Sequence, residues 1–208
     1  EIKVHIQKKL NKFENKYFYG KEFRVTRSLK NKFEIKIDRK KYFYTQPSLN
    51  GKHQEENASI SIYFAKIMKN MGYKLNTKEI NAAIKKTLWP GRLEVISYKN
   101  KKIILDGSHN IDGAEKLNEF LKTKKIKPVV LFGMLNNKKA SLFLNKIKKR
   151  VSKVLAIKIP DEKNSFKSKQ INEICDLHSI KCEQVKNIND ALKYFRYNQQ
   201  TVYLVTGS

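Results

Sequence analysis

The alternation of apolar and amphipathic segments after Gly91 constrains the fold more than any other feature of the sequence. Segments 128–132 (PVVLF), 153–157 (KVLAI) and 201–205 (TVYLV) are almost continuously apolar, as is typical of strands buried on both faces of a sheet. Helix-like periodicity fills the intervals between them. The pattern predicts an α/β domain with a mostly parallel, doubly wound sheet.

The expected elements of this domain follow one another closely. A hairpin is expected first, formed by RLEVISY and KKIILD around Lys99-Asn100. The strands are then expected at 102–106, 128–132, 153–159, 181–185 and 201–205. The helices between them are expected at 112–122, 138–150, 167–178 and 189–197. In such sheets ligands bind beyond the carboxyl ends of the strands, which directs attention to the residues that follow each strand.

The segment before Pro90-Gly91 has a different character. Alternating residues predict an antiparallel meander of three strands, followed by two helices. The strands are expected at 22–29, 32–38 and 40–46, and the helices at 53–72 and 76–88. Because Pro90-Gly91 stops the second helix, we predict a domain boundary there, with one domain at 1–90 and another at 91–208.

The first of these helices shows a clear apolar repeat. Its apolar residues recur at intervals of four, three and four, at Ile60, Phe64, Ile67 and Met71. This spacing predicts that these four side chains form the buried face of the helix.

Composition limits the classes of function. The net charge is +26, but 39 of the 45 basic residues are Lys and are spread along the whole chain, so we expect weak, salt-sensitive binding and no specific reading of nucleic acid. No apolar run approaches the roughly 20 residues of a membrane span. Cys175 and Cys182 fit no CxxC spacing, and we expect them to be reduced in a cytoplasmic protein. The charged start without Met suggests that the chain begins inside a longer protein.

The junction ILDGSHNIDGAEKL, at 103–116, carries more polar residues than a turn requires. A turn with a helix cap accounts for Gly107 and for one of Asn110 or Asp112. It leaves Asp106 and His109 without a role. An Asp at the carboxyl end of a strand can accept hydrogen bonds from ribose hydroxyls, and a His at a helix start can meet a phosphate or carboxylate. On the residues alone, the structural and the functional interpretation stay equally open.

Three further positions are candidates for a site. Arg92 follows the Pro-Gly break, where it is either a solvated residue or a partner for a phosphoryl oxygen. Asn57 lies in the first turn of a predicted helix, after LNGKHQEE, where capping competes with recognition of a base edge. Ser208 ends the third strand-to-loop junction, YLVTGS. The sequence contains no GxxxxGK[ST], GxGxxG, HExxH or GxSxG motif, so it carries no complete catalytic machinery of those kinds.

Taken in order, five motifs resemble the downstream half of the folylpolyglutamate synthase/dihydrofolate synthase family, in the Mur ligase superfamily. They are LNGKHQEENA, WPGRLEVI, ILDGSHNIDGA, LFGMLNNK and YLVTGS. The resemblance implies that residues 1–90 end a P-loop ATPase domain and that residues 91–208 form most of a Rossmann-like C-terminal domain. The phosphate loop and the Mg²⁺ ligands would then lie upstream of residue 1.

The resemblance also implies a reaction and roles for the candidate residues. ATP would phosphorylate a carboxylate of dihydropteroate or a folate, and L-glutamate would attack the acyl phosphate. Asn57 would contact adenine, Arg92 the ATP phosphates, and Asp106 the ribose. His109 would lie near the phosphates or glutamate, with Ser208 on the glutamate side. We expect a monomer that is inactive without its upstream part; the alternative is a non-catalytic nucleotide-binding module.

Overall fold

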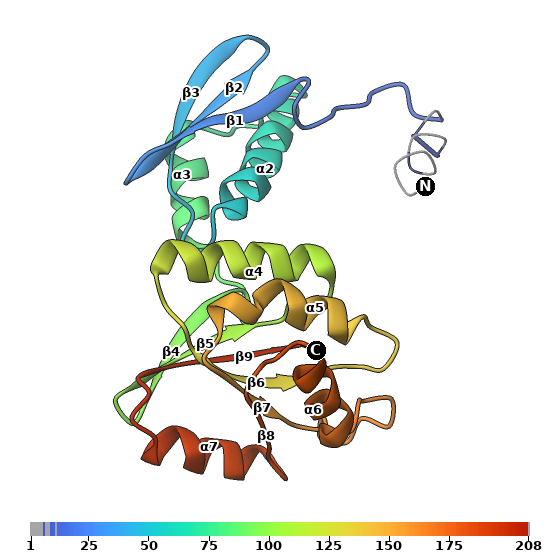
Figure 1. Ribbon diagram of the computed structural model, residues 1–208. Helices are drawn as coiled ribbons and strands as arrows, with labels where there is room; N and C mark the ends of the chain where they lie inside the picture. Colours follow the sequence, from blue (N-terminus) through green and yellow to red (C-terminus); the bar gives the residue numbers. More distant parts are fainter. Residues whose placement is uncertain (1–5, 7–8, 11, 208) are drawn as a thin grey trace. The chain divides into compact units, whose positions relative to one another are not determined.

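The structure is a computed structural model that describes residues 6, 9–10 and 12–207, and the chain divides into two compact units (Figure 1). Unit 1 comprises Glu1–Ser48 and His53–Thr87, and unit 2 comprises Leu49–Lys52 and Leu88–Ser208. The short segment Leu49–Lys52 therefore belongs with residues much later in the chain. Within the described residues, no helix is both long and apolar enough to span a membrane.

Unit 1 is a three-stranded antiparallel meander packed against two helices. The strands are β1 (Phe23–Ser28), β2 (Lys32–Ile37) and β3 (Lys40–Thr45), and the helices are α2 (His53–Asn70) and α3 (Thr77–Lys86). The chain turns from β2 to β3 at Asp38 and Arg39, both with positive φ, as a tight two-residue hairpin requires. Asn76 and Glu79 form a reciprocal capping box that fixes the start of α3.

The predicted buried face of α2 is wrong at three of its four residues, and only Ile67 packs against the core of unit 1. Ile60, Phe64 and Met71 are 52%, 61% and 69% exposed, whereas Ile62 and Tyr63 are buried. The helix is apolar on two sides, so the spacing alone could not choose between them. Packing on the sheet determines which side of α2 is buried, because the ring of Tyr63 stacks on that of Phe23 in β1, with ring centroids 4.5 Å apart.

Unit 2 is built on a six-stranded sheet in the order β4-β5-β9-β6-β7-β8. The strands are β4 (Glu94–Tyr98), β5 (Lys101–Asp106), β6 (Val129–Gly133), β7 (Lys153–Ala156), β8 (Cys182–Gln184) and β9 (Val202–Gly207). β4 pairs antiparallel with β5, and all the other pairs are parallel. The mostly parallel α/β sheet predicted from the sequence is therefore confirmed.

Helices cover the two faces of this sheet unequally (Figure 1). The helices are α4 (Ile111–Lys124), α5 (Ala140–Ile147), α6 (Ser168–Leu177) and α7 (Ile188–Tyr197). One core joins the first three helices to one face, and a second core joins α7 to the other. In the four inner strands, β5, β9, β6 and β7, neighbouring residues alternate between the cores, as Ile103 and Ile104 do in β5. This double burial explains the continuous apolar runs in the sequence.

The last strand, β9, is inserted between β5 and β6. Parallel pairing aligns Asp106 with Thr206, and Gly133 with Gly207, at the carboxyl ends of the three strands. The backbones of the two glycines approach so closely that a Cβ atom on Gly207 would lie 1.8 Å from the carbonyl oxygen of Gly133. Gly207 also has φ +128°, which L side chains rarely adopt. Glycine is therefore required at this point of the sheet.

Replacement of Gly207 tests this close approach. Gly207→Ala should destabilise the chain by about 3 kcal/mol, because overpacking and an unfavourable φ add together. Gly107→Ala is the matched control, since its Cβ would meet nothing closer than 3.6 Å and its φ is ordinary. Urea unfolding followed by circular dichroism measures both variants. Equal stability of the two would mean that β6 and β9 are not packed as described.

Candidate functional site

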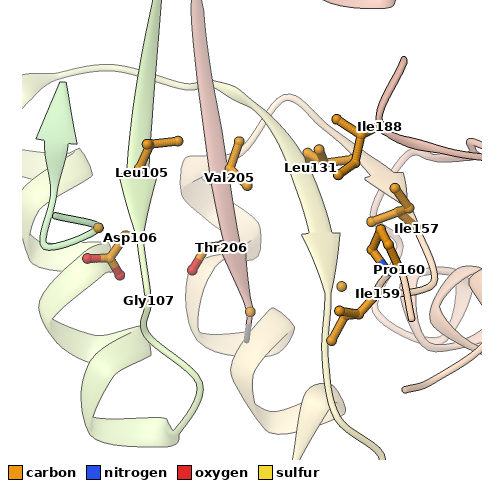
Figure 2. Close-up of a pocket in the computed structure, with 13 residues that line it drawn as sticks. Leu105, Asp106, Gly107, Leu131, Ile157, Ile159, Pro160, Ile188, Val205 and Thr206 are labelled. Atoms are coloured by element: carbon orange, nitrogen blue, oxygen red, sulfur yellow. The ribbon is translucent and has the colours of Figure 1, made fainter. Parts of the chain in front are cut away.

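A pocket of about 320 Å³ opens at the carboxyl ends of β5, β9, β6 and β7 (Figure 2). Its floor is apolar and includes Leu105, Leu131 and Val205, while Asp106 and Thr206 carry the polar atoms on neighbouring strand ends. It lies where β9 is inserted between two strands that follow each other in the chain, the kind of edge at which α/β sheets bind ligands. An apolar floor with a few polar groups suits a ligand with both an apolar and a charged part.

The carboxylate of Asp106 holds two loops at the edge of this pocket. Its Oδ2 atom accepts a hydrogen bond from the backbone N–H of Leu93 at 3.2 Å, and Oδ1 accepts one from the N–H of Ser108 at 3.2 Å. The residue is only 8% exposed, so these bonds satisfy a carboxylate that burial would otherwise destabilise. Asp106 therefore has a structural role that the sequence did not reveal, and each oxygen retains capacity to accept a further bond.

The loop that carries Arg92 is fixed on both sides. The N–H of Gly107 donates to the carbonyl oxygen of Gly91 at 2.7 Å, and Asn50 Nδ2 donates to the carbonyl oxygen of Leu93 at 2.9 Å. Leu93 is 2% exposed and has φ +49°, an uncommon conformation for a Leu. The burial of Leu93 and its hydrogen bonds hold this strained turn in place.

Arg92 lies between these two anchors with an exposed side chain. Its guanidinium carbon lies 5.8 Å from the centroid of the Trp89 ring, a distance at which a cation–π contact stabilises the charge without covering its N–H donors. A fixed backbone and an exposed guanidinium make a suitable partner for a phosphate or carboxylate.

His109 is exposed at the start of α4, one residue before the helix cap. Its Nδ1 atom lies 3.0 Å from the carbonyl oxygen of Gly107. A carbonyl can only accept, so Nδ1 donates, and Nε2 is left to contact a ligand. The cap itself is Asn110, whose Oδ1 accepts from the N–H of Gly113 at 2.8 Å. This resolves the choice between Asn110 and Asp112 that the sequence left open.

Two residues that support the loops of this site were not predicted from the sequence. Thr206 is 5% exposed, and its hydroxyl donates to the carbonyl oxygen of Ser108 at 3.3 Å, so it supports the same loop as Asp106. Its position within YLVTGS marked it as a candidate, but the prediction named Ser208, two residues later. Asn50 lies in the motif LNGKHQEENA, but its contact was not predictable, because the bond to Leu93 joins residues 43 positions apart in the chain.

Asn57 is exposed on α2, in unit 1, and its Nδ2 atom donates to Oε1 of the buried Gln54 at 2.9 Å. Gln54 Nε2 in turn lies 3.1 Å from His53 Nε2. These contacts orient the amide of Asn57. Of the predicted site residues, the structure thus brings Arg92, Asp106 and His109 to one edge of unit 2.

The remaining predictions concern residues and ions that the structure does not place. Ser208 lies outside the described residues. Across 6, 9–10 and 12–207, no group of three or more His, Cys, Asp or Glu side chains is arranged to hold a metal ion.

Comparison with known proteins gives consistent matches. Residues 91–208 match the family described as Mur ligase, glutamate ligase domain. The chain is 35% identical over 94 residues to the dihydrofolate synthase/folylpolyglutamate synthase of Bacillus subtilis, covering 44% of this chain and 21% of that enzyme. It is 32% identical over 114 residues to the folylpolyglutamate synthase of Lacticaseibacillus casei, covering 54% and 26%.

A solved structure is similar over nearly the whole chain. The bifunctional folylpolyglutamate synthase/dihydrofolate synthase of Yersinia pestis, complexed with AMPPNP and a Mn ion, superimposes with a TM-score of 0.78. The match covers 99% of this chain and 48% of that one at 18% identity, so it supports the fold. This chain therefore spans about half the length of that enzyme, and its matches span smaller parts of the two curated relatives.

The double hydrogen bond of Asp106 leads to a stability prediction. Asp106→Ala leaves the N–H groups of Leu93 and Ser108 without their acceptor, and should lower the free energy of unfolding of unit 2 by about 3 kcal/mol. Asp112→Ala removes the same charge from an exposed first-turn position and should cost only about 0.5 kcal/mol. The single tryptophan, Trp89, lies in unit 2, so its fluorescence during urea unfolding provides the measurement. A small, equal effect of both changes would contradict the role of the Asp106 carboxylate in holding the two loops.

Proposed function

The chain belongs to the Mur ligase family, whose glutamate ligase domain matches residues 91–208, and we propose that it is the C-terminal part of an ATP-dependent ligase of folate biosynthesis. The enzyme adds L-glutamate to dihydropteroate, to folylpolyglutamate, or to both. The names of the two curated relatives support the folate substrate, and the description of the family supports the glutamate. Residues 1–90 are then the end of the ATPase domain, and residues 91–208 most of the glutamate ligase domain.

The reaction forms an amide in two steps. A carboxylate oxygen of the pterin substrate attacks the γ-phosphorus of ATP, and ADP leaves, giving an acyl phosphate. The amine nitrogen of L-glutamate then attacks the acyl carbon, the bond from that carbon to the phosphate oxygen breaks, and the nitrogen loses a proton. Negative charge is transferred between oxygens throughout, so catalysis depends on positioning and on fixed positive charge.

The observation that best supports the proposal is that Arg92 has a fixed backbone and an exposed guanidinium. Its loop is tied to the carboxyl end of β5 by the bonds from Leu93 to Asp106 and from Gly107 to Gly91, while the guanidinium remains exposed. A cation whose backbone is held in advance needs little reorganisation to meet the ATP phosphates. Arg92 therefore contacts the phosphates and stabilises the charge that develops during transfer.

Each of the other predicted residues has its own role in binding the substrates. Asp106 uses its remaining acceptor capacity for the ribose hydroxyls of ATP. His109 presents Nε2 to the phosphates or to the incoming glutamate, and Ser208 contacts the glutamate. Asn57, oriented by its bond to Gln54, contacts the adenine edge.

ATP and Mg²⁺ are the required cofactors. The complex of the Yersinia pestis enzyme with AMPPNP and Mn supports a nucleotide together with a divalent cation. As the resemblance to the family implies, we propose that the Mg²⁺ ligands lie upstream of residue 1. When bound, the cation would neutralise charge on the phosphates. We further propose that the enzyme is a cytoplasmic monomer and that this chain does not catalyse ligation without its upstream part.

Arg92 gives the sharpest test of catalysis. In the full-length enzyme, Arg92→Ala should lower folate- and glutamate-dependent phosphate release by at least about 100-fold, the scale for loss of a preorganised charge contact. Phosphate release assayed with dihydropteroate and with a reduced folate, each with L-glutamate, measures this and identifies the preferred substrate.

Arg196 provides the matched control, since it is also exposed and its guanidinium carbon lies 5.2 Å from the centroid of the Tyr197 ring on α7. Arg196→Ala should retain activity within about twofold, as expected for an exposed side chain outside the site. Wild-type rates in Arg92→Ala would refute the assignment. If the full-length protein bound ATP but ligated glutamate to neither substrate, the alternative of a non-catalytic nucleotide-binding module would replace the proposal.

Asn57 tests the adenine contact separately. Asn57→Ala should weaken ATP binding by about tenfold, corresponding to about 1.4 kcal/mol for one lost hydrogen-bonding group. Asn70→Ala, at the exposed far end of the same helix, should leave ATP binding unchanged. Calorimetric titration of the full-length enzyme with ATP and with GTP makes the comparison, and loss of discrimination between the two bases should accompany the weaker binding. Unchanged affinity and base preference would remove Asn57 from the site.

A further inference from the structure

The two cysteines lie together in unit 2, on elements that take no part in the proposed ligase site. Cys175 is in the last turns of α6 and is completely buried, while Cys182 is the first residue of β8 and is partly exposed. Both belong to the packing of one core, Cys175 inside it and Cys182 against it. Both are free thiols.

The end of α6 explains why the two residues meet. The N–H of Ile180 donates to the carbonyl oxygen of Cys175 at 2.9 Å, and the N–H of Ser179 donates to that of Asp176 at 3.0 Å. Ser179 has φ +55°. This is the Schellman arrangement that ends many helices, and it turns the chain back alongside the last helical turn. Two residues after Ile180, the start of β8 brings Cys182 beside Cys175.

A hydrogen bond links the two thiols, and it shifts their pKa values in opposite directions. The Cys175 thiol donates to the Cys182 sulfur, and this hydrogen bond, together with burial, raises the pKa of Cys175. The same hydrogen bond lowers the pKa of Cys182. The more accessible sulfur is therefore the better nucleophile, and the buried one is held as a thiol next to it.

We propose that Cys175 and Cys182 are a peroxide-sensitive pair that closes to a reversible intramolecular disulfide. The Cys182 thiolate attacks a hydroperoxide, the O–O bond breaks, and a sulfenic acid forms on Cys182 with release of hydroxide or alkoxide. The Cys175 sulfur then attacks the Cys182 sulfur, the S–O bond breaks, and water leaves with the thiol proton. Two electrons pass from the two thiols to the peroxide, and a dithiol reductant restores them.

The bond would join the end of a core helix to an edge strand. β8 pairs only with β7 among the described strands, and it is three residues long. A covalent link from its first residue to α6 would fix this end of the sheet, whereas the dithiol leaves it held by packing, by the β7 pairing and by the ion pair of Lys153 with Glu183. Oxidation therefore alters local opening of this edge and not the sheet order.

Peptide mapping of the wild-type chain provides the test. Trypsin cleaves after Lys169, Lys181 and Lys186, so the two cysteines fall on separate peptides, 170–181 and 182–186. After treatment with hydrogen peroxide and alkylation without reduction, we expect these peptides as one linked species, lighter by two hydrogens than their sum. Reduction should separate the two peptides. The number of titratable thiols should fall from two per chain to none after peroxide treatment, and it should return to two after reduction. Two separately oxidised or alkylated peptides, or linkage between chains, would overturn the proposal.

Two variants assign the roles. In Cys175→Ala, the disulfide cannot form, so a dimedone adduct of the sulfenic acid should accumulate on Cys182, and alkylation of Cys182 should shift to higher pH because its hydrogen-bond donor is lost. In Cys182→Ala, the buried Cys175 should react neither with the alkylating reagent nor, after peroxide treatment, with dimedone. An unchanged alkylation pH profile in Cys175→Ala, with the fold verified by circular dichroism, would remove the thiol–thiol contact on which the proposal rests. Peptide mapping of the wild-type chain shows whether the disulfide forms, even if one of the variants does not fold.

Discussion

The carboxylate of Asp106 is the interaction on which the proposed ligase site depends. One oxygen holds the backbone of Leu93, and the other holds the backbone of Ser108. Arg92 precedes the first of these residues and His109 follows the second, so a single side chain fixes the backbone position of both. The arrangement includes a cost of about 1–2 kcal/mol for Leu93 in a left-handed conformation. Burial of the Leu93 side chain in the core of unit 2 offsets that cost, which is why a large apolar residue is found where glycine would be easier to accommodate.

This arrangement changes how polar residues at a strand end are interpreted. From the sequence, a structural and a functional role for Asp106 were competing explanations. In the structure the carboxylate makes two backbone contacts and still lines the pocket, so one role does not exclude the other (Figure 2). The same holds for His109, whose Nδ1 is bonded locally while Nε2 is left for a ligand. Groups that bind charge gain precision when their own backbone is held by such bonds.

Local patterns predicted local structure well. The apolar runs predicted the strands of unit 2. Asn76 with Glu79 predicted the start of α3, and Lys99-Asn100 predicted the β4–β5 hairpin. Interactions between distant residues were not predictable in this way. The insertion of β9 between β5 and β6, the bond from Asn50 to Leu93 and the close approach of two glycines depend on the tertiary fold. The buried face of α2 was missed for a related reason: both sides of the helix are apolar, and only the packing of Tyr63 on Phe23 distinguishes them.

The sheet order separates the two chemistries assigned to unit 2. Asp106 is at the end of β5, and Cys182 is on β8, with β9, β6 and β7 between them. A disulfide between α6 and β8 involves neither the loop of Arg92 nor the end of β5, so closing it leaves the bonds of Asp106 in place. Any effect of oxidation on ligation must therefore pass through the packing of the shared core, in which Leu93 and Cys175 both take part. Well-packed cores tend to respond as a unit, but the rigid strands between these residues would limit a local change at the β8 edge. Redox state and glutamate ligation are thus expected to vary independently unless the core itself is loosened.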